Sequence, residues 1–300
     1  MAAKRRRRKS KKLKIFLAIV GVIAAIIAAV FGINEISKSS IPEGTKVEDG
    51  EAMIHFIDVG QGDAILITMS EGNVLIDAGT NSSEDALQNY LDTHRITEIE
   101  YAVFTHPHDD HIGGADMILE NYDVKNVLIP NYPSNTRTYE RMMDGIEKEK
   151  AVLHLAKPDM TFSVGDMMFA VLAPITEMPK DTNNSSIVLK AVYGETAFMF
   201  TGDAEEAPEE EIIARYSKDS LKCDLLKVGH HGSRTSTSQE FLDIVSPEYA
   251  VIQVGIDNEY AHPQQVTLDK LRDAGTQYYR TDLHGDIVFF TDGKTMNKFD

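Results

Sequence analysis

The sequence lacks tryptophan and has a single cysteine, Cys223, among its 300 residues. One cysteine excludes an internal disulfide framework and any zinc site built on several thiolates. Metal chemistry in this chain would therefore depend on histidine and carboxylate ligands. A hydrophobic share of 42% with a charged share of 26% is typical of a globular protein, which excludes intrinsic disorder and coiled coil for most of the chain.

Basic residues are scarce outside the N-terminus. Residues 1–14 hold nine of the 30 Lys and Arg residues and no acidic residue, so the other 21 face 47 acidic side chains and the rest of the chain carries a formal charge of −26. Such a charge repels a polyanion unless basic side chains gather locally. Candidates for a basic cluster are Lys222, Lys227, Arg234, Lys270, Arg272 and Arg280.

Residues 15–33 follow the basic tail as nineteen apolar or glycine residues without a charge. As a helix this run would be about 28 Å long, close to the thickness of a bilayer core. We expect an uncleaved transmembrane anchor here, because the apolar part of a secretory signal peptide is usually shorter, about 7–15 residues. The positive-inside rule then predicts a single-pass cell-membrane protein with tail 1–14 in the cytoplasm. A cleaved signal peptide and a nucleic-acid-binding basic arm are the alternatives.

The rest of the chain is expected to form a linker over 34–50 and one extracytoplasmic domain over 51–300. Short β-branched runs predict a three-stranded meander first and further strands between helices. The last two strands are expected to form a hairpin over 277–290. Two groups of strands with interleaved helices predict an α/β fold: a four-layer αββα sandwich with two sheets face to face. Helices are expected near residues 84–94, 112–121, 138–150, 208–218, 238–245 and 263–275.

The strongest chemical signal is the segment THPHDDHIGG at 105–114, placed where an expected strand ends and a helix begins. It supplies four side chains that can bind metal within six positions: His106, His108, Asp110 and His111. In a tight loop one pair can converge on one ion while the next pair reaches a second. Imidazole and carboxylate ligands without thiolate suit Zn, Mn or Fe.

This segment resembles the His-x-His-x-Asp-His motif of the metallo-β-lactamase-fold hydrolases. Over residues 52–295 the order of motifs is similar to that of the extracytoplasmic nuclease-like domain of the ComEC family of DNA-uptake proteins, and phosphorylcholine esterases share much of it. The other motifs that carry the likeness are DVGQGDAILI (58–67), LIDAGT (75–80), NNSSIVL (183–189), FTGDA (200–204), LKVGHHGS (226–233), NEYAHP (258–263) and YRTDLHGDI (279–287).

The resemblance implies two metal ions, Zn²⁺ or Mn²⁺. His106 and His108 would bind the first ion, Asp110 and His111 the second, and Asp203 would bridge both. Asp110 is also a candidate catalytic residue.

Two further positions complete the implied centre. One histidine of the adjacent pair His230 and His231 would finish the second site while the other orients substrate, and the sequence leaves open which does which. Asp77 matches a position that braces the metal loop by hydrogen bonding. Its alternative role is a turn-capping aspartate before Gly79.

The sequence departs from the broad superfamily at one ligand position. Many members place a further histidine before the bridging aspartate, but here that interval contains only His154, in an apolar segment where a structural role is expected. This lowers the ligand count at the first ion, which would bind weakly, exchange with Mn or be lost. The ComEC-like pattern instead offers pocket residues at Asn183, Asn184, Ser185 or Ser186.

Several residues near these motifs are candidates for substrate contact. Ser233 and Arg234 follow the histidine pair and can donate to a phosphate oxygen. His262, together with Arg280, can contact phosphate or protonate a leaving alkoxide, which makes His262 the second candidate catalytic residue. Its alternative role is a structural turn before Pro263.

These features predict a membrane-anchored metal-dependent hydrolase. Two ions about 3.5–4 Å apart suit phosphodiester hydrolysis by a metal-bound hydroxide, so a phosphodiesterase or nuclease of ComEC-like type is expected, acting on DNA without a nucleotide cofactor. A single hydrophobic run of spanning length does not predict a DNA channel. The alternatives are a phosphodiesterase of cell-wall phosphocholine or teichoic acid, and a non-catalytic binding protein on the same scaffold.

Overall fold

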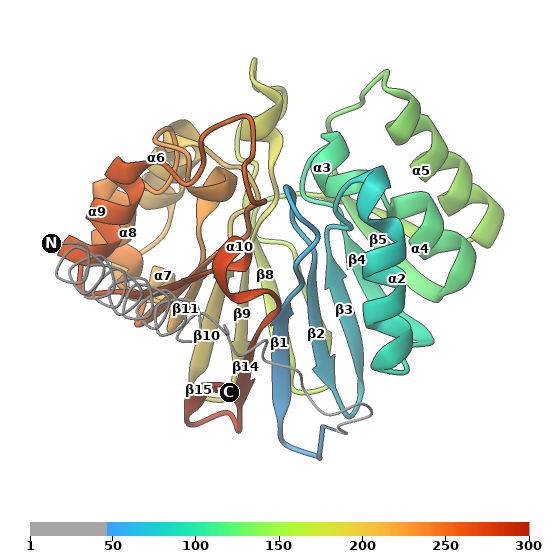
Figure 1. Cartoon of the computed structure of the whole chain (residues 1–300), viewed down its shortest axis with the longest axis horizontal. Helices are drawn as coiled ribbons and strands as arrows, with labels where there is room; N and C mark the ends of the chain where they lie inside the picture. The colour runs from blue at the N-terminus through green and yellow to red at the C-terminus, as the bar shows by residue number, and fades with distance from the viewer. Residues whose placement is uncertain (1–46, 300) are drawn as a thin grey trace, which may run out of the picture. The chain divides into compact units, whose positions relative to one another are not determined.

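The computed structural model describes residues 47–299 (Figure 1). The expected tail 1–14, the expected anchor 15–33 and most of the expected linker 34–50 lie outside the described residues. Within 47–299 no helix is both long enough and apolar enough to cross a membrane.

The first sheet has eight strands in the order β15-β14-β1-β2-β3-β4-β5-β6. Strands β1, β2 and β3 pair antiparallel as the predicted meander, while β3 to β6 run parallel and are joined through helices. The strands are β1 (Ala52–Phe56), β2 (Ile65–Met69), β3 (Gly72–Ile76), β4 (Glu98–Val103), β5 (Asp123–Pro130), β6 (Val152–Ala156), β14 (Ile287–Thr291) and β15 (Met296–Lys298).

The second sheet has seven strands in the order β13-β12-β11-β10-β9-β8-β7. Strands β7 to β10 pair antiparallel, and β10 to β13 run parallel. The strands are β7 (Thr161–Val164), β8 (Met167–Ala173), β9 (Val188–Tyr193), β10 (Thr196–Phe200), β11 (Leu225–Lys227), β12 (Tyr249–Ile252) and β13 (Gln277–Arg280).

Helices cover the outer face of each sheet (Figure 1). The first sheet carries α2 (Glu84–Thr93), α3 (Asp109–Ile112), α4 (Ala115–Asn121) and α5 (Arg137–Glu149), and the second carries α6 (Glu206–Arg215), α7 (Lys218–Leu221), α8 (Gln239–Val245) and α9 (Gln265–Asp273). Three apolar clusters separate the four layers, one between the sheets and one under each helical layer. Central strands such as β1 and β2 are buried on both faces, which explains their continuous apolar sequence. The predicted α/β fold with two sheets is confirmed.

The predicted hairpin over 277–290 is wrong. Strand β13 pairs with β12 in the second sheet, whereas β14 pairs with β1 in the first, so the chain crosses between sheets here. The short helix α10 (Thr281–His284) makes the crossing, and the Thr281 hydroxyl fixes it by bonding the backbone N–H and C=O of Val254. A contact with a residue so distant in the chain is invisible to a local turn pattern.

The helix expected over 112–121 is also different. It is two short helices, α3 and α4, that meet at Gly113 and Gly114. The N–H of Gly113 donates to the C=O of Gly79 at 2.8 Å, and a side chain at 113 would collide with the backbone of Thr80 and Asn81. The break therefore lets the metal-motif loop pack directly against the loop after β3.

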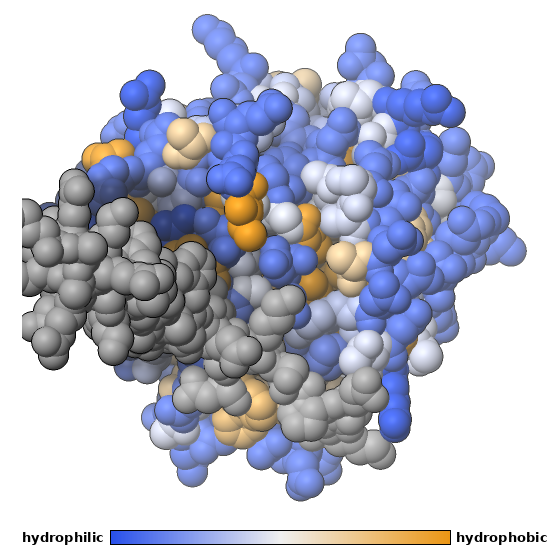
Figure 2. Space-filling model, in the orientation of Figure 1, coloured by the Kyte–Doolittle hydropathy of each residue, from blue (hydrophilic) through white to orange (hydrophobic). Residues whose placement is uncertain are grey.

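Parallel strands bring the candidate site residues to one edge. The carboxyl ends of β3 and β4 lead to Asp77 and to the 105–111 loop, and those of β10, β11 and β12 lead to Asp203, to the short 3₁₀ turn Gly229–Gly232 and to the loop after Val254. This is the edge at which ligands usually bind in α/β sheets. Figure 2 shows a mainly hydrophilic face around these loops, in keeping with the acidic composition.

One buried carboxylate ties the loop after the histidine pair to helix α6. Glu209, 1% exposed, accepts hydrogen bonds from the backbone N–H of Thr237 at 2.6 Å and of Ser238 at 2.8 Å. Burial raises the pKa of Glu209 to about 7, although these donors favour the charged form.

A folded-state pKa above the unfolded value means that the folded state binds the Glu209 proton more tightly. The contribution of this proton to the unfolding free energy is thus complete below about pH 4.5 and is lost as pH rises through about 7. We expect the unfolding free energy of the wild type, minus that of Glu209→Gln, to fall by about 3 kcal/mol between pH 4.5 and 8. Urea unfolding of both proteins at matched pH values measures this difference, and a constant difference would contradict the assignment.

Candidate metal centre

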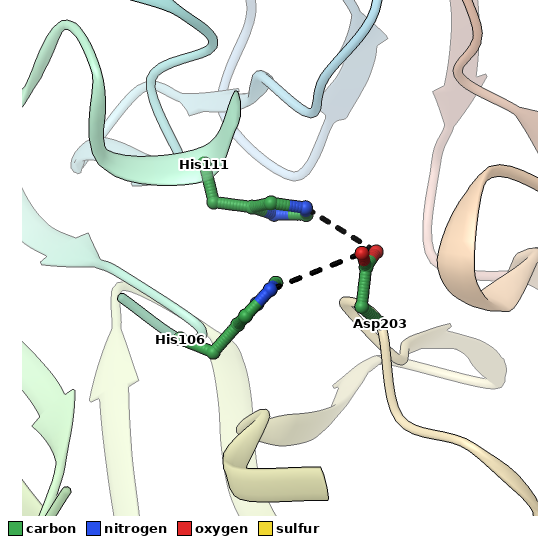
Figure 3. Close-up of side chains that lie close together, drawn as sticks. All are labelled: His106, His111 and Asp203. Atoms are coloured by element: carbon green, nitrogen blue, oxygen red, sulfur yellow. Dashed lines mark ion pairs between the residues drawn. The ribbon is translucent and has the colours of Figure 1, made fainter. Parts of the chain in front are cut away.

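Imidazoles from the first sheet meet a carboxylate from the second at the site. Figure 3 shows the rings of His106 and His111 pointing at the carboxylate of Asp203. The Nε2 of His111 lies 3.2 Å from Asp203 Oδ1, and the Nε2 of His106 lies 3.8 Å from Asp203 Oδ2. All three side chains are almost fully buried.

Asp77 holds the motif loop in place. Its carboxylate accepts hydrogen bonds from the backbone N–H and the hydroxyl of Thr105, both at 2.7 Å, and from His111 Nδ1 at 2.8 Å. With Nδ1 bound to a carboxylate, His111 keeps its Nε2 lone pair directed at Asp203. This is how a neighbouring carboxylate fixes the tautomer of a metal-binding imidazole.

His231 is oriented in the same way from the second sheet. Its Nδ1 donates to the backbone C=O of Gln253 at 2.9 Å, while its Nε2 lies 3.3 Å from Asp110 Oδ2 and 3.5 Å from Asp203 Oδ1. His230 is more exposed, and its Nε2 lies 3.7 Å from Asp203 Oδ2. His231 is therefore better placed to share an ion with Asp110 and Asp203, and His230 faces the pocket.

The backbone of the histidine pair is strained. His230 has φ 49° and His231 has φ 52°, both in the left-handed region that non-glycine residues seldom occupy. Two successive residues of this kind aim adjacent side chains at the centre and at the pocket. Such strain often accompanies a functional site.

His106 and His108 lie together at the other side of the centre. His106 Nε2 is 3.0 Å from His108 Nδ1, and His108 is partly exposed toward the pocket. His154, by contrast, sits on edge strand β6 and bonds Asn126 Oδ1 at 3.0 Å, outside the residues that line the pocket.

The donor set fits a metal cation. His111 Nε2, His231 Nε2 and Asp203 Oδ1 are buried, lack a partner in hydrogen-bond geometry and converge on one another. Two of the ligand groups that could hold an ion are His106 with His111 and Asp203, and Asp110 with His111 and His231. Buried lone pairs that face each other are costly unless a cation satisfies them.

The pKa shifts of the buried ligands also indicate a site for a cation. Burial alone would lower the pKa of His231, but the carboxylates of Asp203 and Asp63 raise it to about 10. Burial would likewise raise the pKa of Asp203, but His231 and His111 hold it well below its usual range. The centre therefore attracts positive charge, and metal binding would displace protons from the imidazoles.

Asp63 and Lys227 belong to this centre although the sequence did not single them out for it. Lys227, at the end of β11, is fully buried, and its Nζ lies 2.7 Å from Asp63 Oδ2. The other carboxylate oxygen of Asp63 lies 3.3 Å from His231 Nδ1, and its backbone N–H donates to Asp110 C=O. The preceding Gly62 packs so closely that a Cβ would lie 2.4 Å from Asp110 O. The motif GQGD around Asp63 was the available signal.

A pocket of about 390 Å³ opens beside the centre. His262 lines it with an unpartnered buried Nδ1. Burial and the nearby rings of His230 and His231 lower the pKa of His262 to about 4, so its neutral form dominates at pH 7. It can therefore accept a proton or hydrogen-bond a substrate, but the free protein does not hold it ready as an acid. The lining residues are Gln61, His108, Asp109, Asp110, Asn183, Asp203, His230, His231, Tyr260 and His262.

Of the NNSS segment, Asn183 reaches the pocket, with its amide nitrogen 3.5 Å from both ring nitrogens of His230. The other three residues make structural bonds: Asn184 Oδ1 accepts from the N–H of Glu205, the Ser185 hydroxyl donates to Thr182 C=O, and Ser186 Oγ accepts from the N–H of Asp203.

Ser233, Arg234 and Arg280 are not brought to the pocket. The Ser233 hydroxyl bonds that of Thr235, Arg234 is exposed on the surface, and Arg280 pairs with Asp282 at 2.5 Å.

The expected basic cluster is mostly engaged elsewhere. Lys222 pairs with Asp219, Lys227 with Asp63 and Arg272 with Asp269, while Lys270 donates to backbone carbonyls of Ser236 and Thr237. Together with Arg280, five of the six candidates therefore have local partners.

The buried Lys227–Asp63 pair generates a prediction. Lys227→Met leaves an unpaired buried carboxylate, so we expect a loss of about 3–5 kcal/mol in unfolding free energy. The double variant Asp63→Asn with Lys227→Met should lose less than the sum of the single variants, which urea unfolding measures as a double-mutant cycle. Lys222→Met, on an exposed lysine, is the matched control and should change stability by less than about 0.5 kcal/mol. Strict additivity in the cycle would contradict the coupling.

Comparisons with known proteins agree with this geometry. Residues 57–255 match the metallo-beta-lactamase superfamily. ComE operon protein 3 of Bacillus subtilis (strain 168) is 32% identical over 257 residues, which cover 80% of this chain and 33% of that protein. Competence protein ComA of Neisseria gonorrhoeae is 31% identical over 247 residues, with 81% and 33% covered. The chain spans about a third of the length of these curated relatives.

A solved structure supports the fold. CmlA, a diiron beta-hydroxylase from Streptomyces venezuelae, matches with a TM-score of 0.54 at 15% identity, over 81% of this chain and 54% of that chain. At this identity the likeness concerns the fold alone. With the family match over 57–255, the relatives and the two-sheet architecture in agreement, this chain belongs to the metallo-β-lactamase superfamily of metal-dependent hydrolases.

Proposed function

We propose that this chain is a metal-dependent phosphodiesterase of the nuclease type. The observation that carries the proposal is the convergence of unpartnered buried Nε2 atoms of His111 and His231 on Asp203, beside a pocket that His231 and Asp203 line. His106, His108 and Asp110 complete the ligand set that we propose for two ions, Zn²⁺ or Mn²⁺. Divalent ions at such a centre polarise a phosphoryl oxygen and lower the pKa of water.

The charge of the site supports two ions rather than one. Asp63, Asp77, Asp110 and Asp203 bring four carboxylates together, and the Lys227 ammonium pairs with one of them, Asp63. One divalent ion would leave this set negative, whereas two would make it positive and able to attract a phosphodiester anion.

The chain's own polar groups would position the substrate. Gln61 and Asn183 carry amides that can donate to phosphoryl oxygens from the pocket wall. Neutral His262 can donate or accept one hydrogen bond there and can take up a proton at its free Nδ1. His230, held between Glu205 and Asp203, adds a further donor.

The relatives support nucleic acid as the substrate class, because one of them is named a competence protein and the motif order of this chain resembles that of the nuclease-like domain of the ComEC family. The engaged basic residues favour a second candidate, a small phosphodiester of a cell-wall polymer such as a phosphocholine or teichoic-acid unit. Such a substrate needs less positive surface than a long polyanion. The two candidates share the centre and differ in what the pocket rim recognises.

Removing a proposed ligand should abolish turnover without unfolding the protein. We expect Asp203→Ala and Asp110→Ala each to lower metal-dependent hydrolysis of bis-p-nitrophenyl phosphate by at least about 10²-fold, because these carboxylates serve the ions rather than the apolar core. Bound metal, measured in the same samples, should fall with activity. Asp85→Ala, an exposed aspartate on α2, is the control and should keep both. Full activity in either ligand variant would overturn the metal assignment.

We also propose that residues 15–33 anchor the enzyme in the cell membrane, with the catalytic domain outside. Protease added to intact cells should then digest the 51–300 domain and spare the basic tail, which an antibody against each end detects. Protection of the domain until the cells are lysed would refute this orientation.

A further inference from the structure

We propose that Tyr260 is a stacking platform for a planar ring attached to the scissile phosphate, the chemistry of a nucleobase. This inference rests on the proposed phosphodiesterase function and assigns a recognition element that the metal centre does not supply. It concerns the loop Gly255–His262, which follows β12 and borders the pocket.

The loop presents apolar side chains to solvent beside a polar pocket. Tyr260 is 61% exposed and Ile256 is 73% exposed, whereas most large apolar side chains of the described residues are buried. An exposed apolar side chain at the mouth of a pocket gains free energy when a ligand covers it. Tyr260 lines the pocket, so a ligand that fills the pocket meets its ring.

The loop is held in shape by one side chain. Asn258 Nδ2 donates to the C=O of Gly255 at 2.9 Å and to the C=O of His262 at 2.7 Å, and its Oδ1 accepts from the N–H of His262 at 3.0 Å. Three hydrogen bonds from one residue close both ends of the loop. The backbone that carries Tyr260 is thus fixed, so binding need not order the loop first.

Tyr260 begins a row of rings that leads to the metal centre. Its ring is near-parallel to that of His262, with centroids 5.7 Å apart and an interplanar angle of 26°. His262 in turn meets His230 edge-on at 5.4 Å, and His230 Nε2 lies 3.7 Å from Asp203. A phosphate held at the centre therefore has its organic substituent alongside aromatic surface on the way out.

Charge around the loop argues for stacking rather than for phosphate contacts. The loop carries exposed Asp257 and Glu259, and Asp109 lies on the pocket wall. Of the six candidate basic residues, five have local partners, and Arg234 lies on the surface outside the residues that line the pocket. Stacking on an aromatic side chain needs no positive charge and tolerates any base.

A cationic head group is the competing ligand, since acidic residues and one tyrosine would also attract it. Such groups are usually enclosed by several aromatic faces, whereas Tyr260 is the one Phe, Tyr or Trp side chain among the residues that line the pocket, and its neighbours His262 and His230 are imidazoles. The geometry therefore favours a planar ring.

The test compares thymidylyl-thymidine with its analogue in which tetrahydrofuran replaces each base-bearing sugar, using the metal-loaded full chain. We expect the wild type to prefer the base-bearing substrate in kcat/KM, and Tyr260→Ala to reduce that preference roughly 5- to 100-fold, mainly through KM. Tyr260→Phe should keep the preference, because stacking needs the ring and not the hydroxyl. Leu155→Ala, an exposed apolar residue on edge strand β6, is the matched control and should behave as wild type.

A binding titration separates this inference from the proposed function. Thymidine 5′-phosphate, deoxyribose 5-phosphate and phosphocholine are titrated calorimetrically into wild type and Tyr260→Ala. Suppose that no substrate is cleaved, but that thymidine 5′-phosphate binds more tightly than deoxyribose 5-phosphate and Tyr260→Ala removes the difference. The proposed phosphodiesterase function is then wrong, and the role of Tyr260 as a stacking platform is supported. Cleavage without any preference for a base overturns the platform alone. Preferential binding of phosphocholine through Tyr260, or no difference among the three ligands, also overturns it.

Discussion

The rest of the site depends on compensation of buried negative charge where the two sheets meet. Asp203 reaches from the second sheet toward four imidazoles, while Asp63, Asp77 and Asp110 approach from the first. Buried carboxylates are tolerated only when paired. Lys227 compensates one of them, and protons or metal ions on the imidazole side must balance the others. The same requirement explains why the buried Asp77 carboxylate accepts three hydrogen bonds from the motif loop, two from Thr105 and one from His111.

That constraint couples the two halves of the fold. The side-chain amide of Gln253, which follows β12, donates to the C=O groups of Ile57 and Ala64, and its backbone C=O accepts from His231 Nδ1, so one buried residue joins both sheets to a proposed ligand. Lys227 and Asp63 make a second connection of this kind. A disturbance of sheet packing at this edge therefore moves ligand atoms directly, because interiors packed at crystal-like density transmit small shifts.

The sequence predicted the fold and the main cluster because both are locally encoded. Runs such as 52–56 and 65–69 alternate with turn residues, and four candidate ligands lie within six positions at 106–111. The hairpin over 277–290 failed because the partner of each strand is far away in the chain. Lys227 was a candidate for the basic cluster for the same reason, since its partner Asp63 lies in the loop between two strands of the other sheet. Pairings between distant segments leave no local pattern, so a single sequence cannot show them.

The acidic composition of the chain and the row of rings beside the pocket both bear on which substrate the site would bind. Beyond residue 14 the chain carries a formal charge of −26, which is poorly suited to hold a long phosphate backbone, so attraction for anions would be concentrated at the proposed metal centre. What remains for specificity is the uncharged part of the substrate, and the row from His230 through His262 to Tyr260 supplies aromatic surface where that part would lie. With the phosphate at the proposed metal centre and the ring on Tyr260, the site would favour substrates bound through one phosphate and one ring. Such binding suits cleavage near the end of a strand or within a flexible single strand more than cleavage along a rigid duplex.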